Sequence, residues 1–176
     1  MTARDLVAVS GVARSVGVST ALVEQPYRVK GRRSPAPAGQ LDAAWTAVVE
    51  HLRAGPFSGL PAITGGRSSG ARVACRTAEQ TGAAAVLCLA FPLIPPRRSP
   101  DTPPTSREPE LAAVPVPVLV VQGERDQFGM PSPAPGRAVV AVTGDHRLVS
   151  DLAAVSTAVR DWLTELLATS GYGARP

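Results

Sequence analysis

A glycine- and serine-rich stretch, residues 65–70, contains the residue types of a nucleophilic serine site. It reads Gly-Gly-Arg-Ser-Ser-Gly, and Gly66 to Gly70 fit the pattern G-x-S-x-G with Ser68 at the centre. In this pattern a sharp turn between a strand and a helix exposes the serine hydroxyl, and the two glycines let neighbouring backbone pass closely. Glycine and serine also gather in ordinary turns, so a plain glycine-rich loop is the alternative unless other residues supply the partners.

A serine hydroxyl becomes a good nucleophile when an imidazole accepts its proton and a carboxylate orients that imidazole. The chain has two histidines, and His51 lies in a stretch with helical periodicity, which leaves His146 as the candidate base. Asp126, which follows a strongly apolar run, is the candidate carboxylate. The order Ser68, Asp126, His146 differs from the chymotrypsin and subtilisin orders and is the order of α/β-hydrolase triads.

Each of these residues has rivals or a simpler role. Ser69 is the rival nucleophile, although the pattern favours Ser68, and its backbone amide would supply one oxyanion donor. Glu124 and Asp145 are weaker rival acids. Asp126 alone could be an ordinary loop acid, and His146 alone could cap the helix that follows it. The catalytic interpretation therefore rests on the residues taken jointly.

The hydrophobic pattern predicts elements that would bring these residues together. Apolar, β-branched runs predict strands, and runs with a 3.6-residue period predict helices. The predicted strands are 18–26, 60–64, 83–91, 116–123 and 137–143; the predicted helices are about 40–54, from the Gly70 turn to about 81, and about 150–168. Strands that alternate with helices predict one α/β domain over residues 1–176, a doubly wound, mostly parallel sheet with helices on both faces. Functional residues gather beyond the carboxyl ends of such strands, where Ser68, Asp126 and His146 would lie.

Composition narrows the function classes. An apolar fraction of 44% with 18% charged residues indicates a globular domain. The net charge is +4, but aromatic residues make up 4% and the basic residues are scattered, so we expect no nucleic-acid partner. Charges at Arg4, Asp5 and Arg14 interrupt the first twenty residues, so we expect neither a secretory signal nor a membrane partner, and a cytoplasmic protein. Cys75 and Cys88 lack metal-ligand spacing and are predicted to be buried thiols, with no metal site.

Four blocks resemble a known family. "GGRSSGARVA", "LAFPLIPP", "VPVLVVQGERDQFG" and "GDHRL" occur in the order seen in the α/β-hydrolase family that includes testis-expressed protein 30 and is related to dienelactone hydrolases. The resemblance runs from about residue 18 to 165. It implies Ser68, Asp126 and His146 as the triad. It implies neither a substrate nor proof of activity, since relatives include proteins regarded as scaffolds. We expect no cofactor.

The start of the chain departs from that family. Members usually begin with a strand that ends in a His-Gly-Ala-Gly type loop, which supplies the second oxyanion amide, and residues 1–17 contain nothing similar. We therefore expect a sheet that lacks an N-terminal strand and the oxyanion loop, with residues 5–14 forming at best a short helix. Strand 18–26 would border an exposed edge, and such an edge favours poor solubility or a homodimer.

Two hypotheses of different classes follow. The first is a serine hydrolase that cleaves a small ester, lactone or thioester through an acyl-enzyme. The second is a non-catalytic α/β-hydrolase-like protein that binds a partner through its arginine- and proline-rich loops, residues 27–39 and 92–110. A lid and a partner surface are both open as roles for these loops, and the sequence does not distinguish them.

Overall fold

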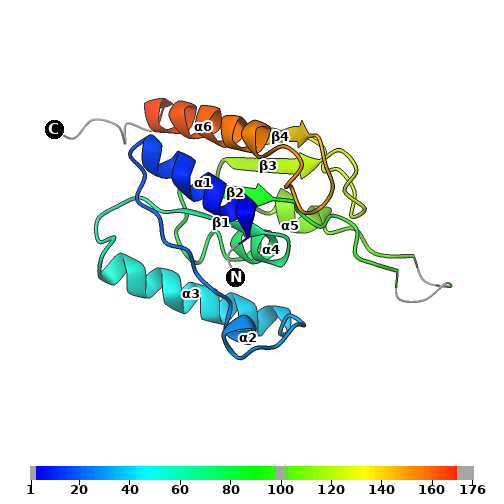
Figure 1. The fold of residues 1–176 in the computed structure, drawn as a ribbon. Coiled ribbons are helices and arrows are strands. Elements are labelled where there is room, and N and C mark those ends of the chain that lie inside the picture. Colours follow the sequence, from blue (N-terminus) through cyan, green and yellow to red (C-terminus); the bar gives the residue numbers. More distant parts are fainter. Residues whose placement is uncertain (1–2, 98–100, 102, 170–176) are drawn as a thin grey trace.

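A parallel four-stranded sheet forms the centre of the fold in the computed structural model, which describes residues 3–97, 101 and 103–169 (Figure 1). The strands pair in the order β1-β2-β3-β4. They are β1 (Ile63–Arg67), β2 (Ala85–Leu89), β3 (Val118–Gly123) and β4 (Arg137–Val142). All three pairings are parallel, so the four carboxyl ends lie at one edge of the sheet.

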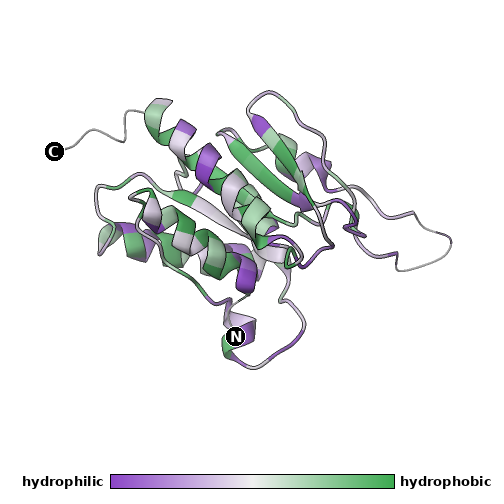
Figure 2. Ribbon diagram, turned by 45° about the horizontal axis from the view of Figure 1, so that its top comes forward, coloured by the Kyte–Doolittle hydropathy of each residue, from purple (hydrophilic) through white to green (hydrophobic). Residues whose placement is uncertain are grey.

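The two inner strands are the most apolar. Every residue of β2 and β3 is buried, and both strands read as continuous runs rather than as alternating patterns. Such runs are typical of strands that helices cover on both faces. Figure 2 shows hydrophobic residues concentrated along these strands. The expected α/β fold with helices on both faces is confirmed.

Two helices cover one face of the sheet. α1 (Arg4–Ser15) packs against α6 (Leu152–Thr169), and the two helices share one apolar cluster with buried residues of β2, β3 and β4. The main buried contacts of this layer come from Val9, Val12, Val155, Val159, Leu87, Leu119 and Val121. α1 runs antiparallel to the strands, which places its first turn near their carboxyl ends (Figure 1). We expected at best a short helix in this region, and the structure instead has a 12-residue helix.

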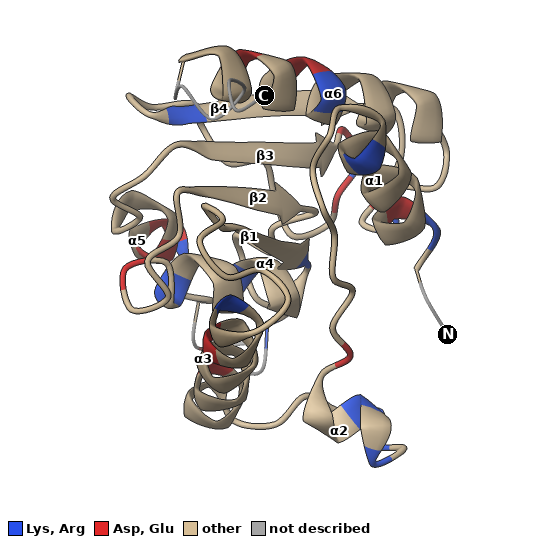
Figure 3. Ribbon diagram, turned by 90° about the vertical axis from the view of Figure 1, so that its left-hand side faces the viewer, with Lys and Arg blue, Asp and Glu red and all other residues tan. Residues whose placement is uncertain are grey.

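The other face carries α4 (Ser69–Arg76) and α5 (Glu108–Ala112), with α3 (Ala38–Ala54) packed on α4 and the short α2 (Pro26–Val29) beside it. Ala71 and Ala74 are fully buried, and their small side chains let α4 lie directly on β2. Ion pairs hold this layer together, and Figure 3 shows basic and acidic segments of α3, α4 and α5 on this side of the sheet. They join Arg72 to Glu110, and Arg76 to Asp42.

The two cysteines lie inside this second layer. Cys75 of α4 and Cys88 of β2 are buried free thiols whose sulfur atoms are 3.4 Å apart. The hydrogen bond between them, together with burial, raises the pKa of Cys88 well above its ordinary value. The expectation of buried thiols is confirmed.

The predicted strand at 18–26 is wrong. Residues 18–25 have no regular structure, Pro26 begins α2, and Leu22 is 53% exposed. A strand is stable only when a neighbour satisfies its backbone groups, and no strand in the described part of the chain pairs with this segment. A hydrogen bond between the hydroxyls of Ser10 and Thr20 ties the segment to α1.

Other elements also begin or end at residues different from those predicted. β1 begins at Ile63 and continues through Gly65 and Gly66, which we had assigned to the turn, because these residues pair with Leu87 and Cys88. The helix expected to reach about 81 ends at Arg76, and α5 begins at Glu108 within the predicted loop 92–110. Residues 98–100 and 102 of that loop lie outside the described residues.

Gly123, the last residue of β3, lies too close to the loop after β4 for a side chain to fit. A Cβ atom there would lie 2.5 Å from the carbonyl oxygen of Asp145 and 2.8 Å from that of Gly144. Gly123→Ala must therefore push the loop after β4 away, and we expect it to lower the free energy of unfolding by about 1–3 kcal/mol. Denaturant unfolding measures this loss.

Gly39→Ala in α3 is the matched control, because a Cβ at Gly39 would meet nothing within 4 Å. Alanine favours helix over glycine, so this variant should be as stable as the unaltered chain or up to about 1 kcal/mol more stable. Equal stability of the two variants would contradict the steric argument.

Candidate active site

Ser68 occupies the turn between β1 and α4 with an unusual backbone. Its φ is 54° and its ψ is −113°, and a positive φ is uncommon for any residue except glycine. Its amide donates to the carbonyl of Leu89 at 2.9 Å, which extends the ladder between β1 and β2 by one bond. The sheet on one side and the helix on the other thus hold Ser68 in a strained conformation that lifts its side chain off the sheet edge.

The two glycines of the pattern differ in importance. A Cβ at Gly66 would lie 2.5 Å from the carbonyl carbon of Gly70, so this position has room for glycine alone. A Cβ at Gly70 would meet nothing within 4 Å, and our expectation that both glycines are needed for close approach is wrong for Gly70. The tight contact is made by the Gly70 backbone, which passes over Gly66.

The structure brings Ser68, His146 and Asp126 into one continuous chain of contacts. His146 Nε2 lies 2.9 Å from Ser68 Oγ, and His146 Nδ1 lies 2.8 Å from Asp126 Oδ2. Asp126 follows β3, and His146 lies in the loop between β4 and α6. The Asp126 side chain is fully buried, whereas the His146 side chain keeps 17% of its surface exposed. The Phe128 ring and the imidazole form a T-shaped pair, with centroids 4.5 Å apart and an angle of 76° between the ring planes.

Both carboxylate oxygens of Asp126 have donors besides the histidine. The backbone N–H of Phe128 donates to Oδ1, and the side-chain amide of Gln122 lies 2.9 Å from Oδ2. Gln122 is itself completely buried, and its amide nitrogen also lies within hydrogen-bond distance of the carbonyls of Phe91 and Gly129. These contacts fix the carboxylate in the position where it meets the imidazole.

Gln122 and Arg67 are two residues of this site that our reading of the sequence did not assign. Gln122 had a visible signal, since it is the one polar side chain within the apolar run of β3. Arg67 occupies the variable position before Ser68. Its Nη2 donates to the backbone carbonyl of His146 at 3.0 Å, and its Nε forms an ion pair with Asp5 of α1.

The rival residues do not enter the chain of contacts. Asp145 accepts hydrogen bonds from Arg147, and the backbone N–H of Arg147 is the main cause that lowers the pKa of this exposed carboxyl. Glu124 is exposed, and so is His51 on α3. Ser69 is the first residue of α4, and the first amides of a helix have no acceptor within it.

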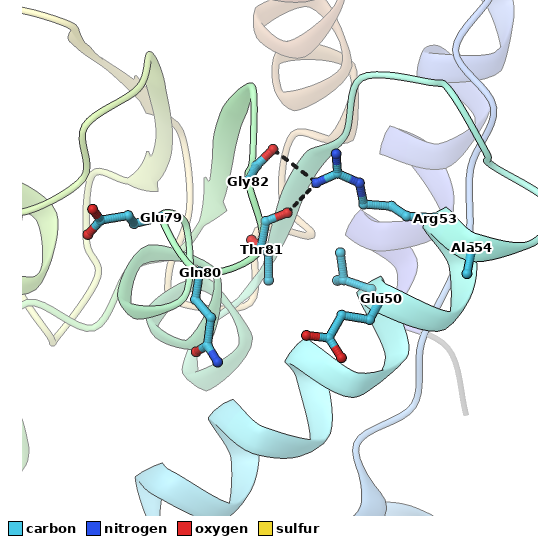
Figure 4. A pocket seen from close by; sticks show the side chains of 8 residues that line it. Glu50, Arg53, Ala54, Glu79, Gln80, Thr81 and Gly82 are labelled. Carbon is cyan, nitrogen blue, oxygen red and sulfur yellow. Dashed lines mark hydrogen bonds between the residues drawn. The ribbon is translucent and has the colours of Figure 1, made fainter.

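Two hollows on the surface lie apart from these residues. One of about 430 Å³ lies between the end of α3 and the turn before β2, where Arg53 donates to the carbonyls of Thr81 and Gly82 (Figure 4). The other, of about 510 Å³, lies beside Tyr27. Neither is lined by Ser68, Asp126 or His146, so we assign neither to the candidate site.

Metal-ligand clusters and membrane-spanning helices are both absent from the described residues. No group of three or more His, Cys, Asp or Glu side chains in residues 3–97, 101 and 103–169 is placed to hold a metal ion. None of the described helices has the length and apolar character of a membrane span.

Several solved structures share the fold. An α/β serine hydrolase homologue from Coxiella burnetii is 16% identical, with a TM-score of 0.64 over 93% of this chain and 77% of that chain. An α/β serine hydrolase without a lid from Xanthomonas campestris is 19% identical, with a TM-score of 0.61 over 92% of this chain and 75% of that one. A structure of metagenome-derived lipolytic enzymes is 13% identical, with a TM-score of 0.66 over 94% and 88%.

No curated protein matches the sequence. Residues 12–151, however, match the family described as the alpha/beta hydrolase domain. That match spans most of the chain, and it includes the Ser68 turn, Asp126 and His146. The chain therefore belongs to the α/β-hydrolase family.

Proposed function

We propose that the chain is a serine hydrolase that cleaves a small ester, lactone or thioester through an acyl-enzyme. The observation that carries the proposal is the unbroken contact from Ser68 Oγ through the imidazole of His146 to the buried carboxylate of Asp126. An imidazole nitrogen 2.9 Å from the hydroxyl oxygen is within reach of the serine proton.

Each residue has a defined role in the proposed reaction. Ser68 Oγ attacks the acyl carbon while His146 Nε2 takes its proton. When the tetrahedral intermediate collapses, the leaving alkoxide or thiolate takes that proton from His146, and the acyl group stays on Ser68. Water then attacks the acyl-enzyme, giving its proton to His146, and the acid leaves as Ser68 regains its proton. Asp126 keeps Nδ1 protonated and stabilises the imidazolium in both steps.

The amide of Ser69 is the proposed oxyanion donor. It follows the nucleophile and begins α4, where unpaired N–H groups and the helix dipole favour negative charge. An oxygen that develops charge on a carbon bound to Ser68 would lie near this end of the helix. One such donor is worth roughly 3 kcal/mol of transition-state stabilisation.

The substrate class is supported by related proteins. Neighbours in fold are named serine hydrolases and lipolytic enzymes, and the sequence blocks resemble those of the family of testis-expressed protein 30 and the dienelactone hydrolases. We further propose a cytoplasmic protein that can form a homodimer along the outer edge of β1, which among the described residues pairs with β2 alone.

Ser68→Ala tests the nucleophile. A fluorophosphonate probe should label the unaltered chain at Ser68, and the variant should neither bind the probe nor hydrolyse p-nitrophenyl acetate above background. Ser69→Ala is the matched control, because it keeps the backbone amide and should still be labelled. Mass spectrometry of the digested adduct identifies the modified residue.

Two outcomes would contradict the assignment. An adduct on Ser69 would move the nucleophile by one residue. An unaltered, folded chain that takes no probe would favour the non-catalytic interaction protein instead.

Asp126→Asn tests the orienting carboxylate. An amide in place of the carboxylate favours the wrong imidazole tautomer, so we expect kcat to fall by about 10³- to 10⁴-fold with little change in KM. Steady-state kinetics measures both. Glu124→Gln removes a neighbouring exposed acid and should leave kcat unaltered; equal losses in the two variants would show that Asp126 has no special part.

A further inference from the structure

We propose that Arg67 is a positioning residue that, together with Asp5, ties the His146 loop to the first turn of α1 and so sets the imidazole against Ser68. This inference rests on the proposed hydrolase function, in which His146 is the base. It concerns a side chain that does not touch the reacting atoms and acts through the backbone of the histidine.

The guanidinium of Arg67 joins two segments that are distant in sequence. Its Nη2 donates to the carbonyl of His146 at 3.0 Å, across 79 positions of the chain, and its Nε lies 2.9 Å from Asp5 Oδ2. Arg67 itself is fixed because it is the last residue of β1 and pairs in register with Leu89. The planar guanidinium group has several N–H donors in a rigid arrangement, called the fork below, and can make both contacts at once. Lysine lacks this property.

The hydrogen bond from Arg67 reaches the one part of the loop after β4 that carries the proposed base, His146. The loop after β4 is anchored on one side of His146 by the Arg125 amide, which donates to the Gly144 carbonyl at 2.9 Å. On the other side, the Leu148 amide donates to Asp145 at 3.1 Å. Among the described residues, Arg67 is the side chain that binds the backbone of His146 itself. Its loss would free the carbonyl to rotate, and the imidazole would move with it.

Asp5 is the second partner of the Arg67 guanidinium, and water has little access to its carboxylate. Its side chain is 1% exposed. Burial raises the pKa of Asp5 above 3.8, and the positive charge of Arg67 opposes that rise. The carboxylate also lies in the first turn of α1, where the helix dipole favours a negative charge. Removing the charge of Arg67 would leave the Asp5 carboxylate buried without a partner, which is strongly unfavourable.

Two variants separate positioning from folding. Arg67→Lys keeps a positive charge beside Asp5, but its single ammonium lacks the fork that reaches both Asp5 and the His146 carbonyl. The double variant Asp5→Asn, Arg67→Met removes both charges together, so that no carboxylate stays buried at position 5 without its partner. We expect kcat to fall about 10- to 100-fold in each, with KM within about twofold of the unaltered chain. The rate of fluorophosphonate labelling should fall in parallel.

Arg72→Lys is the matched control. Arg72 forms a similar ion pair with Glu110, its side chain is 24% exposed against 25% for Arg67, and its partner lies on α5. This variant should lose stability comparably but keep kcat within about twofold, because its contacts do not reach His146.

The outcomes distinguish this inference from the function on which it rests. Normal kcat in Arg67→Lys and in the double variant, with an unaltered chain that hydrolyses and labels, would overturn the positioning role and leave the hydrolase intact. An equal fall in Arg72→Lys would also overturn it, since general loosening would then be the cause. An unaltered chain that takes no probe and hydrolyses nothing would overturn both.

Discussion

Ser68 adopts a backbone conformation with a positive φ in the turn between β1 and α4. The geometry of the whole site depends on that turn. Three contacts maintain it: the amide of Ser68 bonds to Leu89, Gly66 lets the Gly70 backbone pass, and the alanines of α4 let that helix lie on β2. Each of these contacts also belongs to the packing of α4 and β1 on β2, which stabilises the fold independently of the site. The strain at Ser68 is therefore held by the sheet and helix rather than by the serine itself.

The parallel sheet then brings the remaining residues to the same edge. Asp126 and His146 lie beyond the ends of β3 and β4. The side-chain amide of the buried Gln122 contacts the Asp126 carboxylate and helps to position it. The guanidinium of Arg67 binds the backbone of His146 and helps to position the imidazole. Polar groups buried in this way are favourable only when each finds its partners. The contacts of Arg67 with Asp5 and His146 consequently connect the helix layer on one face to the candidate site at the edge.

Sequence patterns were sufficient where the signal is local. The continuous apolar runs of β2 and β3 predict buried strands, and the serine pattern with a later acid and histidine predicts which side chains meet. Strand pairing is not local, so residues 18–25 resemble a strand by composition but have no partner, whereas Gly65 and Gly66 resemble a turn but join the ladder with β2. The contact of Arg67 with His146 crosses 79 positions of the chain, and no periodicity or spacing reveals it.

The most direct test of this account is a crystal structure of the chain after reaction with a small alkyl phosphonate. The account predicts phosphorus bonded to Ser68 Oγ, the phosphoryl oxygen within hydrogen-bond distance of the Ser69 amide, and the imidazole of His146 still in contact with Asp126. An adduct on another residue would contradict it. So would a phosphoryl oxygen directed away from the start of α4, because the strained turn would then have no part in stabilising the charge that develops in the reaction.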